Sequence, residues 1–410
     1  MQARKTTPWL TIGQLAASAL GGFFSLLIAA GTFANGSTLS PITATSIHEN
    51  NTFYSIAVLA LFLCALHTIS LVRAVQRLIG KPHQAPLLKQ PYRTATLCLL
   101  SWLPIITIGY LISQHKSGWS FMPIINLVSV VIPIWWLVEY SRRRLPRPSS
   151  QRTWGIVSTS LSIVPTVIII LEVVIISIAM LTLFILLSPQ PIWAERFEQL
   201  YRSASSANVD LNVLENFLHA LINDPLSASM LFIIVGVVIP LVEEFLKPLA
   251  LWALASRKPT PAEGFSLGLI SGAAFALLES AGLLSQINGT DWAPMVLLRS
   301  STNLLHITAS GLVGWGLASV WSQKRYKRAI FSLLAAAAIH GVWNTMAMTI
   351  GFSPFLVSPK PGDITLGGGQ ILIICVMSAE LVGMFLLLTK MNLRLRAENA
   401  TQLPLDNIDS

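Results

Sequence analysis

Ten long apolar stretches dominate the chain, and polar residues gather in the short segments between them. A helix needs about 20 consecutive apolar residues to cross the hydrocarbon core of a bilayer, and each stretch reaches that length. The pattern therefore predicts an all-α fold, a polytopic transmembrane helical bundle of about ten spans. The fifth stretch is long and contains Pro165, so we expect it to be kinked, tilted or partly interfacial. The stretches are approximately 8–34, 53–73, 93–113, 121–141, 155–188, 228–255, 264–287, 294–320, 329–351 and 366–390.

The first stretch follows two basic residues and could be taken for a signal peptide. Its apolar run is longer than the usual 7–15 residues of such a segment, so we expect it to be retained as a span. The long segment 189–227 is polar enough to lie outside the bilayer and has an amphipathic pattern. It divides the chain into an N-terminal five-span membrane region at 1–188, an extracytoplasmic segment at 189–227, a C-terminal five-span membrane domain at 228–390 and a cytoplasmic tail at 391–410.

The positions of lysine and arginine predict the orientation, because cytoplasmic loops carry an excess of these residues. With the N-terminus inside, the cytoplasmic segments hold two basic residues before the first span and five at 73–93. They hold five more at 142–152, two at 257–258, four at 324–328 and three at 390–396, which is 21 of the chain's 27. We therefore expect both termini in the cytoplasm.

Composition agrees with a protein that is mostly dissolved in lipid. Hydrophobic residues make up 53% of the chain and charged residues 11%, whereas soluble domains carry about a quarter charged residues. The net charge of +9 comes from short basic runs between apolar stretches, so it marks topology and predicts no nucleic-acid partner. The three cysteines are odd in number and lie in apolar runs, which excludes a disulfide framework.

Charged side chains within a span are costly, and they usually face a cavity or a partner group. In this chain most of the ionisable residues within predicted spans fall in spans six to nine. Span six contains Glu243, Glu244 and Lys247. Helix geometry lets Lys247 reach either glutamate, but one lysine cannot neutralise two buried acids. The second carboxylate must therefore pair elsewhere, take up a proton or bind a ligand.

Span seven carries a stripe of small residues that ends in an acid. Gly264, Gly268 and Gly272 recur every four residues, and Phe275 and Glu279 continue the same face. Small residues let a neighbouring helix approach closely. The stripe by itself predicts helix packing, whereas packing does not require the acid at its end.

Spans eight and nine each present polar groups on one face. In span eight the spacing by four, three and four places Arg299, Asn303, His306 and Ser310 within a narrow arc. In span nine His340 and Asn344 lie one turn apart. Four helices can therefore bring glutamates and histidines to one place, although sequence alone leaves open that each histidine only bonds to a neighbouring helix.

In this order the motifs resemble those of the PrsW-type intramembrane proteases, relatives of the CAAX prenyl endopeptidases and of bacteriocin-processing membrane proteins. The run Glu243–Lys247 is similar to the family's EExxK signature, and Phe275–Glu279 is similar to its FAxxE motif. His306, and His340 with Asn344, fit the two later histidine motifs. The resemblance covers roughly residues 228–351, and Ser280 departs from the amide or aromatic residue often found after the second motif.

The resemblance implies hydrolysis of peptide bonds in membrane-associated substrates. Hydrolysis requires an activated water, a stabilised oxyanion and a proton for the leaving amine. We expect Glu243 or Glu244, with His306, to deprotonate the water, and His340 and Asn344 to stabilise the oxyanion. Glu279 would orient a histidine or the water. The supporting residues are expected to be Lys247, Phe275, Arg299 and Asn303.

Two versions of this site differ in their need for a metal. Two histidines and carboxylates form a workable zinc set, here Glu244, Glu279, His306 and His340. The sequence has no HExxH pair, and the ligands would come from four separate helices. On these grounds the sequence favours a site that requires no cofactor, with zinc as the alternative.

Other classes of function use similar residues. Intramembrane acids and histidines also build proton-coupled transporters, and a catalytically silent relative would act as a membrane scaffold. The polar groups lie in one half of the chain only, which argues against transport. As an intramembrane protease of this type, the protein is expected in the inner membrane of a bacterium, with a membrane-anchored protein as its substrate.

Overall fold

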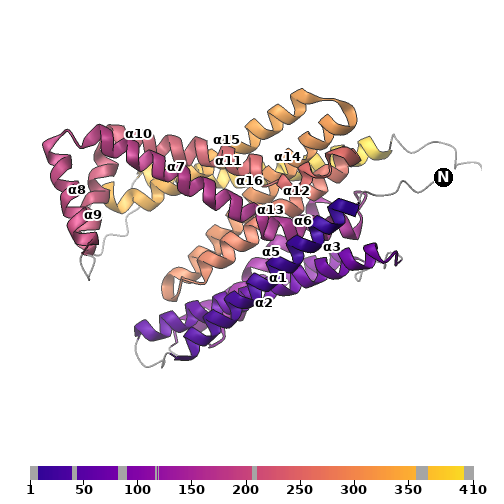
Figure 1. Cartoon of the computed structure of the whole chain (residues 1–410), viewed down its shortest axis with the longest axis horizontal. Coiled ribbons are helices and arrows are strands. Elements are labelled where there is room, and N and C mark those ends of the chain that lie inside the picture. Colours follow the sequence, from indigo (N-terminus) through magenta and orange to yellow (C-terminus); the bar gives the residue numbers. More distant parts are fainter. Residues whose placement is uncertain are drawn as a thin grey trace, which may run out of the picture. The chain divides into compact units, whose positions relative to one another are not determined.

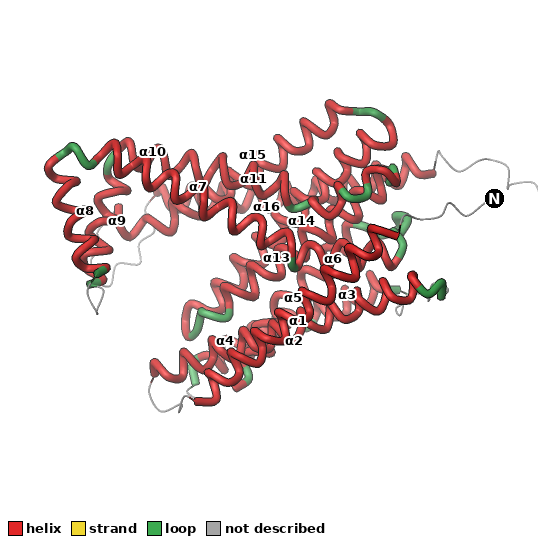
Figure 2. Tube along the Cα trace, viewed as in Figure 1, coloured by secondary structure: helices red, strands yellow, loops and turns green. Residues whose placement is uncertain are grey.

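The computed structural model describes residues 8–38, 44–81, 90–115, 118, 120–205, 210–356 and 368–400. Throughout these ranges the regular structure is helical and contains no strand (Figure 2). Ten of the helical segments are long and apolar enough to cross a membrane. The prediction of an all-α polytopic bundle with ten spans is therefore confirmed. The spans are Trp9–Thr38, His48–Leu78, Pro91–Ser113, Met122–Ser141, Ser150–Leu187, Pro225–Trp252, Pro261–Leu284, Gly289–Gln323, Tyr326–Phe352 and Gly368–Ala400.

Two spans of the first half are interrupted three residues before a proline. The third span breaks at Ser101, ahead of Pro104, and the fifth breaks at Ser162, ahead of the Pro165 that predicted a kink. Proline lacks an N–H and its ring clashes with the preceding turn, so each proline lies in the first turn of a new helix instead. The helices are α1 (Pro8–Thr38), α2 (Ala44–Leu78), α3 (Pro91–Leu100), α4 (Trp102–Ser113), α5 (Met122–Ser141), α6 (Ser150–Leu161) and α7 (Ile163–Leu187).

The segment after α7 forms two short helices, α8 (Pro191–Ala204) and α9 (Leu211–Asn223), labelled in Figure 1. Their apolar faces pack with the end of α7 in a cluster of Leu183, Leu187, Trp193 and Phe217. The polar faces are left exposed, as the amphipathic pattern of this segment predicts.

The sixth span is irregular. It consists of α10 (Pro225–Ile233), a π-helical turn (Ile234–Val238), α11 (Ile239–Leu246) and α12 (Leu249–Trp252). Pro248 ends α11, because it cannot donate the next helical hydrogen bond and it disfavours helical geometry at Lys247. The paired glutamates of the sequence thus lie in the last turn of α11.

The helices α13 (Pro261–Leu284) and α14 (Trp292–Gln323) pack closely along the predicted glycine stripe. A Cβ atom built on Gly264, Gly268 or Gly272 would lie 2.2–2.3 Å from an atom of α14, and at Gly272 that atom is the carbonyl oxygen of His306. Only glycine permits such a backbone approach. The helices α15 (Tyr326–Leu356) and α16 (Gly368–Ala400) follow.

The chain divides into two compact units that do not follow chain order. The first unit contains the residues up to Thr166, Glu244–Ala336 and the residues from Leu381 onward. Its most buried helices are α13 and α14. The second unit contains Val167–Glu243 and Ala337–Glu380. The division of the chain into four regions at residues 188, 227 and 390 remains a prediction from the sequence.

Candidate active site

The end of α11 supplies a buried ion pair. Glu244 and Lys247 are both fully buried, and the Lys247 ammonium donates a hydrogen bond of 2.6 Å to the Glu244 carboxylate. The same ammonium lies 2.8 Å from Nδ1 of His306 and 4.6 Å from the centre of the Phe275 ring. Because Pro248 stops the helix here, Lys247 lies in a turn, where its carbonyl accepts a hydrogen bond from Ser271. Lys247 thus joins Glu244 to His306.

His306 is held from its other side by Glu279. Nε2 of the imidazole lies 2.5 Å from the Glu279 carboxylate, which also pairs with Arg299 at 2.9 Å. Since a carboxylate only accepts hydrogen bonds, this contact places the ring proton on Nε2 and leaves Nδ1 as an acceptor. Phe275 packs edge-on against the ring, with 5.2 Å between centroids. His306 is 1% exposed, whereas the Glu279 side chain is 41% exposed.

Ser280 links two of the predicted supporting residues. Its hydroxyl donates to the Asn303 side-chain oxygen at 2.6 Å and accepts from Nε of Arg299 at 3.2 Å. The sequence indicates Ser280 only as a departure from the family motif. Ser280 directly follows Glu279 on α13, and this position was the available signal of its role. Its hydroxyl fixes the guanidinium that holds Glu279.

Glu243 and His340 form a second pair within the other unit. Nε2 of His340 lies 4.0 Å from the Glu243 carboxylate, and both side chains are buried. The backbones that carry them are close, because a Cβ on Gly341 would lie 2.0 Å from the carbonyl oxygen of Gly236 in the π-helical turn. The Asn344 amide donates to the carbonyl of Val235 at 3.5 Å. Asn344 therefore contacts backbone in this structure, one turn from His340.

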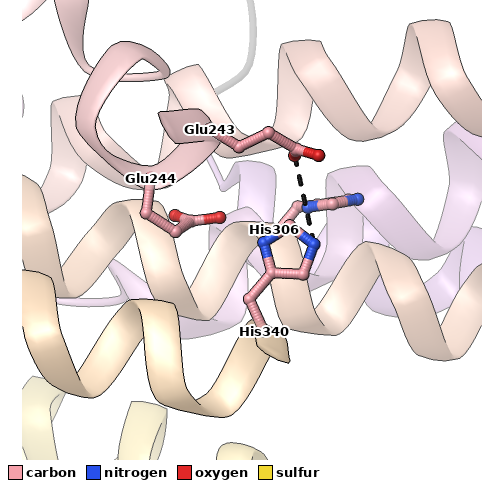
Figure 3. Close-up of side chains that lie close together, drawn as sticks. All are labelled: Glu243, Glu244, His306 and His340. Atoms are coloured by element: carbon pink, nitrogen blue, oxygen red, sulfur yellow. Dashed lines mark ion pairs between the residues drawn. The ribbon is translucent and has the colours of Figure 1, made fainter. Parts of the chain in front are cut away.

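Four of the predicted site residues come together. Glu243, Glu244, His306 and His340 each offer one ligand atom, and these atoms all lie within 4.8 Å of one another. Figure 3 shows the two carboxylates and two imidazoles near each other, with the Glu243–His340 ion pair dashed. The predicted zinc set differs in one member: Glu279 supports His306 from behind, and Glu243 takes its place.

The donor set suits a zinc ion. Carboxylate oxygens and imidazole nitrogens bind Zn²⁺ at about 2.0–2.2 Å, which in a tetrahedral site separates the ligand atoms by roughly 3.4 Å. The four ligand atoms, all within 4.8 Å of one another, would have to move closer together to hold one ion. The Glu279–His306 contact is also the carboxylate–histidine pairing that commonly orients a metal ligand.

The ten candidate spans define an integral multi-pass membrane protein. Its buried cluster of two glutamates and two histidines is typical of the active site of a hydrolase. Residues 203–378 match the model of the PrsW family intramembrane metalloproteases, which extends the four-motif region 228–351 at both ends. Residues 203–378 are thus a PrsW family intramembrane metalloprotease domain, a peptidase domain whose family acts on protein substrates. No curated protein and no solved structure gives a significant match.

The expectation that the site requires no cofactor is wrong. The matching family is one of metalloproteases, and the four clustered donors could hold a metal ion such as zinc. The absence of an HExxH pair suggested otherwise, because that motif places two ligands one turn apart on a single helix. Here the two glutamates are adjacent in α11, and each histidine comes from a different helix.

Proposed function

We propose that this protease cleaves membrane-anchored proteins at a metal site in which Glu244, His306 and His340 hold the ion and Glu243 is the general base. The single observation that carries this proposal is the convergence of the four donors within 4.8 Å. A catalytic zinc site typically has three protein ligands and keeps a position for water or substrate. One of the four donors is therefore available for proton transfer.

The surroundings of the two glutamates favour this division of roles. The Glu244 side chain is fully buried and fixed by Lys247, as suits a residue that holds an ion in one geometry. The Glu243 side chain is 10% exposed and lies 4.0 Å from His340. A general base must be reached by the water that it deprotonates. Glu243 is thus the better acceptor of the water's proton.

The remaining polar residues orient the site. Glu279 holds Nε2 of His306, so that Nδ1 faces Lys247, the ion-pair partner of Glu244. Arg299 and Ser280 fix Glu279 in turn. A bound Zn²⁺ would polarise the peptide carbonyl and lower the pKa of a water molecule. Asn344 lies on the face of α15 that carries His340, and there it can donate to a developing oxyanion once substrate is present.

The position of the donors supports a membrane-anchored substrate. All four lie within candidate spans, at Pro225–Trp252, Gly289–Gln323 and Tyr326–Phe352. A scissile bond must therefore enter the membrane region of the protein, which a segment already anchored in the bilayer does at the least cost. The distribution of basic residues supports cytoplasmic termini, and a bacterial inner membrane is the proposed location.

The test separates the two glutamates by measuring metal content and cleavage on the same purified samples. Glu244→Gln is expected to lose both bound zinc and cleavage of a single-span substrate. Glu243→Gln is expected to keep zinc at one ion per chain, while cleavage falls by about 10²–10⁴-fold. Glu195→Gln, on the outer helix α8, is the matched control and should leave both unchanged.

The two variants also show which part of the proposal is wrong, the assigned base or the metal site. If folded, zinc-loaded Glu243→Gln protein cleaves at the rate of the unchanged protein, the assigned base is wrong. If Glu244→Gln retains zinc and activity, the proposed metal site is wrong. Restoration of activity by zinc after treatment with a chelator checks the metal independently of both variants.

A further inference from the structure

A basic cavity lies in the first unit, at the ends of three helices and away from the glutamates and histidines. Its volume is about 640 Å³, within the range of about 300–1,000 Å³ that is usual for small-molecule sites. Five arginines and one acid line it. They are Arg93 on α3, Arg143, Arg144 and Arg147 after α5, Arg396 on α16, and Glu139 in the last turn of α5.

The acid of the cavity neutralises little of this charge. Glu139 is bound by Arg142, which is outside the lining, and by Arg147 at 2.7 Å. Among the described residues, Arg93, Arg144 and Arg396 have no acidic partner. Guanidinium groups that converge without counter-charges repel one another. An anion in the cavity would relieve that repulsion.

The cavity is formed by well-fixed parts of the chain. Asn392 of α16 is fully buried, and its amide donates to the carbonyls of Ser141 and Arg143 at 2.9 Å each. The Arg143 guanidinium stacks 3.8 Å above the Tyr140 ring, and Tyr140 bonds to Thr389. These contacts tie the end of α5 to α16, so the backbone segments that carry Arg143, Arg144 and Arg396 are joined before any ligand binds.

The start of α3 adds backbone donors to the same cavity. Gln90 and Pro91 line it, and the Gln90 side chain makes no capping hydrogen bond to the helix. The first N–H groups of a helix have no partner within the helix and favour an anion. Arginine forks match the oxygens of a phosphate group in pairs. The lining thus combines two kinds of phosphate donor.

From these observations we infer that the cavity is a binding site for a phosphate-bearing anion, separate from the peptidase site. The three lining segments lie at those ends of the spans Pro91–Ser113, Met122–Ser141 and Gly368–Ala400 that the sequence places in the cytoplasm. The phosphate can come from an anionic lipid headgroup at that interface or from a soluble compound. Basic pockets between membrane helices on this side commonly take lipid headgroups.

The experiment measures binding to purified full-length protein in a neutral detergent. Inorganic phosphate and short-chain phosphatidylglycerol are titrated separately, with short-chain phosphatidylcholine as the zwitterionic comparison, and the shift in unfolding temperature gives each Kd. The cavity variant is Arg93→Gln/Arg144→Gln/Arg396→Gln. Its matched control, Arg325→Gln/Lys327→Gln/Lys390→Gln, removes three positive charges that are exposed and outside the cavity.

The cavity variant is expected to bind at least tenfold more weakly, and the control within twofold of the unchanged protein. Phosphatidylglycerol binding without phosphate binding assigns the site to lipid, and the reverse assigns it to a soluble phosphate compound. Equal weakening in both triple variants, or no binding of either probe, overturns the proposal. If the cavity variant folds poorly, Arg396→Gln alone replaces it, with at least a threefold loss expected and an unchanged Kd counting against the site.

Discussion

Lys247 is the residue on which the buried charges of the first unit depend. Its ammonium lies within hydrogen-bond distance of both Glu244 and His306, two of the four clustered donors. A divalent ion held by the same two side chains would compete with the lysine for their lone pairs. The stability contributed by Lys247 and the stability contributed by a metal should therefore depend on each other.

We predict that Lys247→Met lowers the unfolding temperature in the presence of a chelator and increases the stabilisation produced by zinc. Removal of one partner of a buried ion pair costs about 3–5 kcal/mol, because the other charge is left uncompensated. Zinc would compensate Glu244 in its place. Thermal unfolding in detergent, with and without zinc, measures both effects.

Lys390→Met, an exposed lysine of α16, is the control and should change neither temperature by more than the error of the measurement. A zinc-induced shift in Lys247→Met equal to that of the unchanged protein would show that lysine and metal act independently.

Residue types and spacing predicted that glutamates and histidines of separate helices come together, whereas their individual partners required the structure. The helical wheel let Lys247 reach either glutamate, and the structure pairs it with Glu244. The wheel also could not tell whether Glu279 binds a metal or supports a histidine. Spacing gives the face of a helix, but the neighbour that this face meets depends on helix rotation and depth.

At the scale of the helices, apolar length predicted the spans well because a bilayer imposes a nearly fixed crossing distance. Interruptions were less predictable. Pro165 indicates the break in the fifth span. Pro104 marks the break in the third span in the same way, but that break was not predicted. The π-helical turn at Ile234–Val238 comes two residues before Pro240, which lies in the first turn of α11, so a proline marks this irregularity as well. The turn also lies against α15, where a Cβ on Gly236 would lie 2.4 Å from the hydroxyl oxygen of Thr345.

The α13–α14 contact should be the helix pair least tolerant of added volume. We predict that Gly272→Ala destabilises the protein by about 1–3 kcal/mol, because the new Cβ would lie 2.3 Å from the carbonyl oxygen of His306. The displacement of His306 should also weaken zinc retention. Unfolding temperature and zinc content of the purified variant measure the two effects.

Gly282→Ala supplies the comparison on the same helix, since nothing lies within 4 Å of a Cβ at that position. It should leave stability unchanged or raise it slightly, because alanine favours helix over glycine. Similar losses in the two variants would mean that the contact between the helices does not limit stability.

At the scale of the whole molecule, the orientation in the membrane is the prediction with the most consequences. In a variant in which Cys64, Cys98 and Cys375 are replaced by serine, single cysteines at the exposed positions Ser149 and Ser205 report the two sides. An impermeant maleimide should label Ser205→Cys in intact cells. Ser149→Cys should react only after permeabilisation, because its loop carries five basic residues.

The cysteine-substituted protein without either new cysteine serves as the background. Labelling of Ser149→Cys in intact cells, with Ser205→Cys protected, would invert the topology. It would also place the arginine-lined cavity on the outer face of the membrane.

The two hydrogen bonds of Asn392 have a consequence for how this protein is assembled. The helix α16 leaves the ribosome after α3 and α5. The carbonyls of Ser141 and Arg143 therefore have no Asn392 amide to bond to until most of the chain has been synthesised. A translation product that stops near residue 390 would contain nearly all of the hydrophobic segments and would lack both hydrogen bonds of Asn392. Proteases that degrade unfinished membrane proteins would then meet an end of α5 that is not tied to α16.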